Sequence, residues 1–163
     1  MPRVTFGNTW WGAQWLNTLS YIDYENRLPR GVSYARNGSV KSVHIKGTTV
    51  EASVQGSMPR PYKIVITIPR FKKSDEKAVV GAVIENRLFL LHLLMRKLPS
   101  ELYDALAKKK VQLFPARWDD LHAECSCPDW AVPCKHIAAV VYLIANEIDK
   151  NPFLVFSLHG FDI

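Results

Sequence analysis

All three cysteines of this chain lie within ten residues of one another, and a histidine follows directly. They form the run Cys125-x-Cys127, then six residues, then Cys134-x-His136. Three thiols and one imidazole are a donor set that holds zinc in a tetrahedral site. In extended backbone the side chains at i and i+2 point the same way, so each pair can reach one ion. The chain has no other cysteine, so the pattern predicts one zinc ion bound by these four residues.

The zinc is expected to be structural. Four protein ligands fill a tetrahedral shell and leave no position for water or a substrate. The alternative is three buried free thiols, which are common in protein cores, but this does not explain why all three cluster beside a histidine. The chain shows no Ser/His/Asp order and no glycine-rich phosphate-binding loop. We therefore expect no catalytic residues and a protein that is not an enzyme, with a zinc enzyme as the least favoured alternative.

The cysteine-rich run resembles the SWIM zinc finger family. The string CSCPDWAVPCKHIAAVVYLIA, residues 125–145, matches the core of that finger and implies the same four ligands. The rest of the chain is similar to small prokaryotic SWIM proteins, through Trp-Trp-Gly in residues 8–12, a Leu-Pro-Arg-Gly stretch in residues 28–38 and Val-Gln-Gly-Ser in residues 54–57. Those proteins are associated with Swi/Snf-type helicase-like ATPases, so the resemblance implies such a partner.

Basic residues concentrate in the first part of the chain. Residues 1–73 carry eleven Lys and Arg against three Asp and Glu, a net charge of +8. Residues 74–110 carry seven against five, or +2, and residues 111–163 carry three against seven, or −4. A basic region of this size is typical of proteins that bind polyanions, although a well-solvated surface is the alternative. The candidate nucleic-acid-binding residues are Arg27, Arg30, Arg36, Arg60, Lys63 and Arg70.

The hydrophobic pattern predicts an α+β fold in three regions. Residues 1–73 are expected to form a basic helix-plus-meander region, in which Trp11 and Trp15 face the core from an N-terminal helix. Its antiparallel meander has four predicted strands, at residues 32–36, 39–46, 49–55 and 62–68, and Asn37-Gly38 is the first turn. Residues 74–110 are expected to be helical, at 75–97 and 101–109. Residues 111–163 form the zinc module, a hairpin of 111–114 with 121–127 that zinc staples to a helix at 134–147.

The sequence also restricts the setting in which the chain works. No run of eighteen or more apolar residues appears, so no membrane-spanning helix and no membrane partner are expected. The N-terminus has no secretory pattern, and three clustered cysteines do not suit a secreted disulfide scaffold. We expect a reducing, cytoplasmic location.

These observations predict a zinc-binding adaptor. Its basic N-terminal half would contact DNA or RNA, and its C-terminal half would bind a protein, for which the resemblance implies a helicase-like ATPase. The alternative is a recombination accessory factor that binds a recombinase paralogue, because SWIM proteins of other lineages pair with such proteins.

Overall fold

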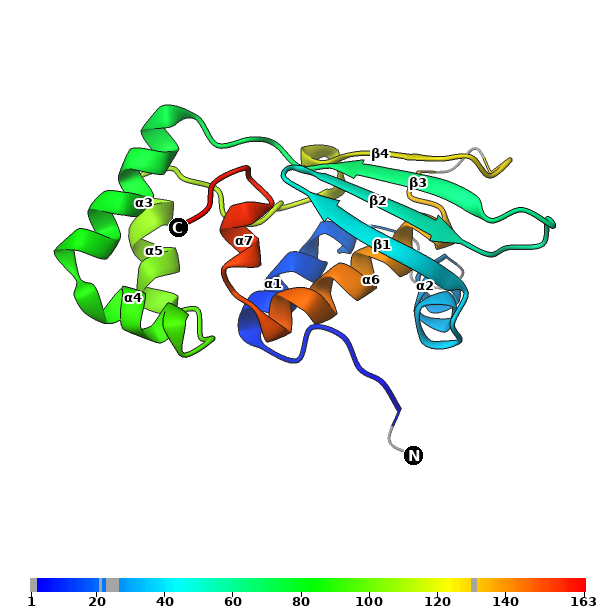
Figure 1. The fold of residues 1–163 in the computed structure, drawn as a ribbon, viewed down its shortest axis with the longest axis horizontal. Coiled ribbons are helices and arrows are strands. Elements are labelled where there is room, and N and C mark those ends of the chain that lie inside the picture. The colour runs from blue at the N-terminus through cyan, green and yellow to red at the C-terminus, as the bar shows by residue number, and fades with distance from the viewer. Residues whose placement is uncertain (1–2, 21, 23–26, 130–131) are drawn as a thin grey trace.

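The computed structural model describes residues 3–20, 22, 27–129 and 132–163. Helices and strands mix along the chain, which confirms the predicted α+β class (Figure 1). In chain order the elements are α1 (Trp10–Leu16), η1 (Asn17–Leu19), α2 (Arg27–Arg36), β1 (Val40–Lys46), β2 (Thr49–Val54), β3 (Tyr62–Thr67), α3 (Lys73–Glu85), α4 (Arg87–Leu94), α5 (Ser100–Lys108), η2 (Trp118–Asp120), β4 (His122–Cys125), α6 (Lys135–Lys150) and α7 (Leu154–Ser157).

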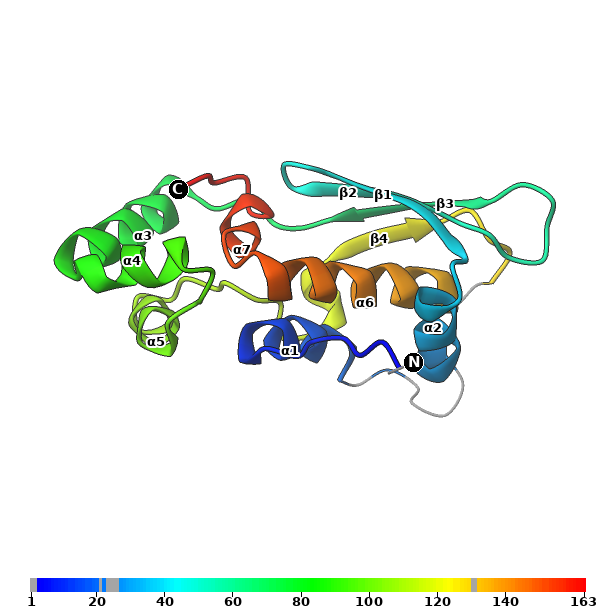
Figure 2. The ribbon, with the colours of Figure 1, turned by 60° about the horizontal axis from the view of Figure 1, so that its bottom comes forward.

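One antiparallel sheet of four strands, in the order β1-β2-β3-β4, covers helix α6 (Figure 2). Alternate residues of β2 and β3 are apolar, and these side chains point to the same face. Val50, Val54, Ile64 and Ile66 are buried on that face, whereas Glu51, Lys63 and Val65 are exposed on the other. The sheet therefore has a core face that packs on α6 and an open, mixed polar face.

The fourth strand of this sheet corrects the predicted zinc hairpin. We expected residues 111–114 to pair with residues 121–127, but β4 pairs with β3 instead, and Cys125 lies opposite Ile64. Residues 111–114 are not a strand, although Val111, Leu113 and Phe114 are buried. The apolar run in 111–114 is core packing without regular structure. The free edge of β3 supplies backbone partners for β4, which a local pairing pattern cannot reveal.

The predicted first strand at residues 32–36 is wrong, because this segment belongs to helix α2. Asn37-Gly38 is not a hairpin turn but the end of that helix. The N–H of Asn37 donates to the carbonyl of Ser33 at 3.0 Å, and Gly38 has φ = 80°. A left-handed residue after a helix is a common way to stop it, and Asn-Gly suits that position as well as a hairpin turn.

Helix α6 is the centre of the fold. It contacts α1, α2, α7 and three strands of the sheet, and its buried stripe includes Ile137, Val141 and Ile148. Helix α1 is bound to it by two indole N–H groups: Trp11 donates to the carbonyl of Ile148 at 2.8 Å, and Trp15 donates to the carbonyl of Val141 at 3.0 Å. The expectation that Trp11 and Trp15 face the core is confirmed.

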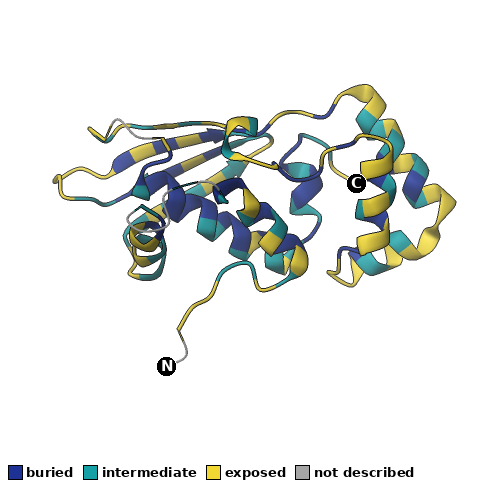
Figure 3. Cartoon of the chain, turned by 180° about the vertical axis from the view of Figure 1, so that it is seen from behind, coloured by how far each residue is buried: buried dark blue, intermediate teal, exposed yellow. Residues whose placement is uncertain are grey.

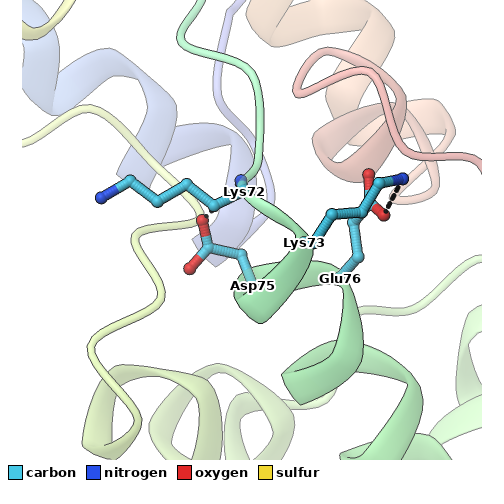
Figure 4. A network of polar contacts seen from close by, with 4 residues as sticks. All are labelled: Lys72, Lys73, Asp75 and Glu76. Atoms are coloured by element: carbon cyan, nitrogen blue, oxygen red, sulfur yellow. Dashed lines mark hydrogen bonds and ion pairs between the residues drawn. The ribbon is translucent and has the colours of Figure 1, made fainter.

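Helices α3, α4 and α5 form an arm on the far side of α7 from the sheet (Figure 1). The carboxylate of Asp75 accepts from the backbone N–H of Lys72 at the start of α3, and Lys73 pairs with Glu76 at 2.9 Å (Figure 4). The single helix expected at residues 75–97 is interrupted at Asn86, whose side chain accepts from the N–H of Leu88 and so begins α4. Short polar side chains are favoured at helix starts for this reason.

The buried imidazole of His159 connects the arm to the sheet. Its ring nitrogens lie 2.6 Å from the carbonyl oxygen of Pro69 and 2.9 Å from that of Leu113. The ring also stacks on Phe71, with 4.2 Å between the ring centroids. One side chain near the C-terminus thus joins the segment after β3 to the segment after α5.

No helix among the described residues combines the length and apolar character that crossing a bilayer requires.

The packing of α2 on α6 predicts opposite effects on stability when alanine replaces each of two helical glycines. A Cβ at Gly31 would lie 2.7 Å from the Cβ of Ala138, which the backbone of α6 fixes, whereas a Cβ at Gly81 in α3 would meet nothing within 4 Å. Gly31→Ala should destabilise the protein by roughly 1–3 kcal/mol because the two helices must separate. Gly81→Ala should stabilise it by roughly 0.5–1 kcal/mol through helix propensity. Urea unfolding of the two variants measures both values; equal stabilisation would show that α2 is not packed this closely.

Candidate metal centre

The four predicted ligands come together where β4 ends and α6 begins. Cys125 is the last residue of β4, Cys127 lies in the turn that follows, and Cys134 is the N-cap of α6. His136 lies in the first turn of that helix. The backbone after β4 is fixed by two hydrogen bonds between Ser126 and Lys63, one through the carbonyl of Lys63 at 3.0 Å and one through its N–H at 2.9 Å.

The donor atoms fit one zinc ion. They all lie within 4.8 Å of one another. The Nδ1 atom of His136 is 3.7 Å from the sulfur of Cys134 and 4.0 Å from that of Cys125. Zinc–sulfur bonds of about 2.3 Å place two tetrahedral sulfur ligands about 3.8 Å apart, so the donors need to close by about 1 Å at most. Three sulfurs and one imidazole nitrogen are the donors of a structural zinc site.

One thiol of the cluster is prepared for metal binding. The pKa of Cys134 is lowered well below its ordinary value, chiefly because its sulfur accepts a hydrogen bond from the Cys125 thiol. His136 and the backbone N–H of Ile137 act in the same direction, against the effect of burial. The same hydrogen bond, together with burial, raises the pKa of Cys125. Thiolate is the form that binds zinc, so Cys134 is the cysteine best prepared to receive the metal.

Two tyrosines from distant parts of the sequence enclose the histidine ligand. Tyr34 of α2 meets His136 edge to face, with 5.2 Å between ring centroids, and Tyr62 of β3 lies 4.7 Å away on the same measure. Gly56 completes the enclosure, since a Cβ there would lie 2.4 Å from the Tyr62 ring and 3.1 Å from Nε2 of His136. Nε2 is buried and has no hydrogen-bond partner among the described residues. The ring is therefore oriented by packing, with Nδ1 turned toward the sulfurs.

Sequence reasoning missed this enclosure. Tyr34 fell in a segment expected to be a strand, and nothing in its local pattern connects it with the cysteines. Helix α2 also holds the metal loop directly: Arg27 donates to the carbonyl of Pro133 at 3.2 Å, and the ammonium of Lys135 lies 5.8 Å from the Tyr34 ring centroid. Of the residues near the metal, only the ligands themselves were predicted from the sequence to belong to the site.

Five of the six candidate nucleic-acid residues lie on elements that meet at the metal end of the sheet. Helix α2 carries Arg27, Arg30 and Arg36, the loop between β2 and β3 carries Arg60, and Lys63 follows that loop (Figure 1). Arg70 lies after β3, at the opposite end of the sheet, beside Gly160. The structure thus places five of these residues on elements at one end of the sheet, with Lys63 on its open face, and separates Arg70 from them.

Comparison with known proteins agrees with this geometry. Residues 110–145 match the family model of the SWIM zinc finger. This segment therefore resembles a SWIM zinc finger. Over 158 residues the chain is 42% identical to the uncharacterized protein Rv2102 of Mycobacterium tuberculosis. That match covers 97% of this chain and 57% of the relative, so the chain spans little more than half the length of the curated relative that it matches. No solved structure matches the chain.

The SWIM finger is built into the larger fold. Its strand, β4, is the edge of the shared sheet, and its helix, α6, is the central helix. A structural zinc ion held by Cys125, Cys127, Cys134 and His136 therefore ties the edge of the sheet to the start of the core helix. Structural zinc supplies folding free energy because the unfolded chain lacks a preformed site.

A ligand variant and a matched non-ligand variant test the site. His136→Ala should abolish stoichiometric zinc, because a three-ligand site leaves the metal exposed to exchange. His122→Ala should keep one zinc per chain, since His122 is exposed on the open face of the sheet and pairs only with Glu124 in the described structure. Metal analysis of the purified variants measures this; zinc retained in His136→Ala would exclude the proposed ligand set.

Zinc removal is expected to act beyond the finger. Chelation should reduce hydrogen-exchange protection at the start of α6 and in α2, because Tyr34 and Arg27 contact the metal loop. The strands β1 and β2 should stay protected, because they pair with each other along their length and Val50, Ala52 and Val54 of β2 are buried. Hydrogen exchange with and without chelator measures this; loss confined to residues 125–136 would contradict it.

Proposed function

We propose that the protein is a zinc-binding adaptor that contacts nucleic acid at its metal end and binds a protein partner at a separate surface. The observation that carries this proposal is the convergence of basic residues from α2 and the β2–β3 loop beside the zinc finger. Lys and Arg that gather at one end of a molecule neutralise neighbouring phosphates together, which is the main source of non-specific affinity for nucleic acids. We define the basic end as α2, residues 55–63 and the finger loop. The finger loop is the metal loop between β4 and α6, described at residues 126–129 and 132–134.

The basic residues of this end divide into two roles. Arg30, Arg60 and Lys63 are exposed and form no ion pair in the described structure, so their charges are free to meet phosphates. Arg27 and Arg36 are half-buried. Arg27 binds the carbonyl of Pro133, and Arg36 binds that of Val4 and lies over the Phe6 ring. We propose that this second pair positions α2 and contributes charge without direct contact.

The acidic charge of residues 111–163 does not oppose this proposal. Most of it lies away from the metal: Glu147 and Asp149 are in the last turn of α6, and a helix of 16 residues is about 24 Å long. Asp149 accepts hydrogen bonds from the N–H groups of Asn8 and Thr9 at the start of α1. Among the described residues of this segment, Glu124 and Asp129 lie in or beside the finger loop, and Asp119 lines a pocket together with Val132 of that loop. The ligand thiolates add further negative charge.

The SWIM resemblance supports a helicase-like ATPase as the protein partner. We propose a non-enzymatic role because the four ligands complete the zinc shell and leave no place for a substrate. In the same proposal the three regions, residues 1–73, 74–110 and 111–163, supply basic charge, the partner surface and the metal.

Salt dependence tests nucleic-acid contact. The triple variant Arg30→Gln, Arg60→Gln, Lys63→Gln should bind a 20-base-pair DNA or a single-stranded RNA more weakly. The plot of log affinity against log salt should become shallower by about 2–3, because each lost phosphate contact on duplex DNA removes about 0.9 from the slope. Fluorescence anisotropy at several salt concentrations measures both quantities.

The matched control removes the same charge elsewhere. Lys72→Gln, Lys108→Gln, Lys109→Gln neutralises three exposed lysines of the helical arm and should leave the slope unchanged. If both triple variants lowered the slope equally, only net charge would matter and the basic end would not be a binding site. If the wild-type protein bound neither nucleic acid at low salt, the nucleic-acid half of the proposal would be rejected.

A further inference from the structure

The helical arm carries the largest concentration of exposed apolar side chains in the described chain. The described chain exposes thirteen large hydrophobic residues, and seven of them fall between residues 80 and 95. Monomeric proteins rarely leave such a group in contact with water unless it has a function. These seven residues, which we name the leucine surface, are Val80, Ile84, Leu88, Leu90, Leu91, Leu94 and Met95.

Helix α4 explains why the surface exists. Six of its eight residues are Leu or Phe, and a helix that is apolar on all sides is normally buried. Here only one side is covered: Leu93 is buried, and Phe89 and His92 are half-buried. The four remaining leucines project outward over more than a third of the helix circumference, and Leu94 is 63% exposed. The tertiary structure thus leaves the outer side of α4 without a partner.

Helix α3 extends the apolar residues along the arm. Val80 and Ile84, four positions apart, lie on one face of α3, and Ile84 is 70% exposed. Figure 3 shows exposed residues along the outer sides of α3 and α4, away from the sheet. Asn86 joins the two helices directly. The arm therefore exposes the two apolar turns of α4 together with the last turns of α3.

The charges around the leucine surface determine what fits it. The exposed basic residues Lys77, Arg87 and Lys97 lie next to it in the sequence, against the exposed acids Glu85 and Glu101. Arg96 is also exposed but is bound to Asn151 and lies over Phe153. A second copy of this chain would place one basic rim against another, because a two-fold interface brings identical patches together. Acidic groups beside an apolar stripe would instead complement the rim.

We propose that the leucine surface docks an amphipathic helix of a protein partner, with an apolar stripe against the leucines of α4 and acidic residues on its flanks. Packing one apolar helix face against another is a recurrent mode of peptide recognition. The proposal deepens the adaptor function, on which it rests for the existence of a protein partner. It places that partner on residues 80–97, away from the basic end and at the start of the C-terminal half.

Two synthetic helical peptides with the same leucine stripe test the proposal. One carries glutamate on its flanks and the other lysine. The zinc-loaded full chain should bind the glutamate peptide at least tenfold more tightly than the lysine peptide, measured by fluorescence anisotropy at low salt. Leu91→Gln, Leu94→Gln should weaken that binding at least tenfold. Met58→Gln, Val65→Gln, which changes two exposed apolar residues outside the arm, should not alter it.

A charge reversal separates complementarity from simple stickiness. Arg87→Glu, Lys97→Glu should invert the preference so that the lysine peptide binds better. Because all substituted residues are exposed, melting temperatures should stay near that of the wild type, and this is checked for each variant. Equal binding of the two peptides, or no binding of either, would overturn the proposal.

Other occupants give distinct results. Sedimentation of a dimer that Leu91→Gln, Leu94→Gln dissolves would assign the surface to a second copy and overturn the proposal. Pelleting with phosphatidylserine-containing vesicles through the same leucines, without peptide preference, would assign it to lipid and also overturn it. DNA binding by the wild-type protein is measured in parallel: DNA binding without peptide binding rejects the docking surface alone, and peptide binding without DNA binding rejects the nucleic-acid half alone.

Discussion

Helix α6 can be buried only if the sheet covers one of its sides and α1 and α2 cover the others, and the rest of the structure follows from this requirement. Its residues Ile137, Val140, Val141, Ile144 and Ile148 have no exposed area. Each such side chain contributes roughly 1.5–3 kcal/mol when removed from water. The tryptophans of α1 bind backbone carbonyls of α6, and Gly31 lets α2 approach its first turns. Coordination of zinc adds a link between the edge of the sheet and the N-terminus of this helix.

The metal end shows how structural and electrostatic roles share the same elements. Helix α2 packs on α6, encloses the histidine ligand with Tyr34 and holds the metal loop through Arg27. Its remaining arginine, Arg30, is exposed, as are Arg60 and Lys63 on other elements at the same end of the sheet. A metal that fixes the start of α6 therefore also fixes the position of the basic residues. In the proposed function, the zinc ion therefore acts on nucleic-acid binding through the position of α2, without a contact of its own.

The two proposed surfaces lie at opposite ends of the molecule. The basic end surrounds the zinc, and the leucine surface is on the arm beyond α7 (Figure 1). The segment after β3 and the segment after α5 join the arm to the rest of the fold. The ring nitrogens of His159 link them through the carbonyls of Pro69 and Leu113. An adaptor needs such a separation, because two large partners can then bind together without steric conflict.

Local chemistry in the sequence was sufficient for several features. The ligand set was predictable because four metal donors at short spacing have few other uses, and the buried indoles because Trp11 and Trp15 repeat at helical spacing. The α+β class and the strands β1 to β3 followed from alternating apolar residues. Three features depended on contacts between distant segments. Strand β4 pairs with β3 across 55 or more residues, Asn37-Gly38 ends a helix that Gly31 packs on α6, and Tyr34 and Tyr62 enclose His136. Local propensity is nearly balanced in such segments, so burial against a partner far along the chain decides their structure.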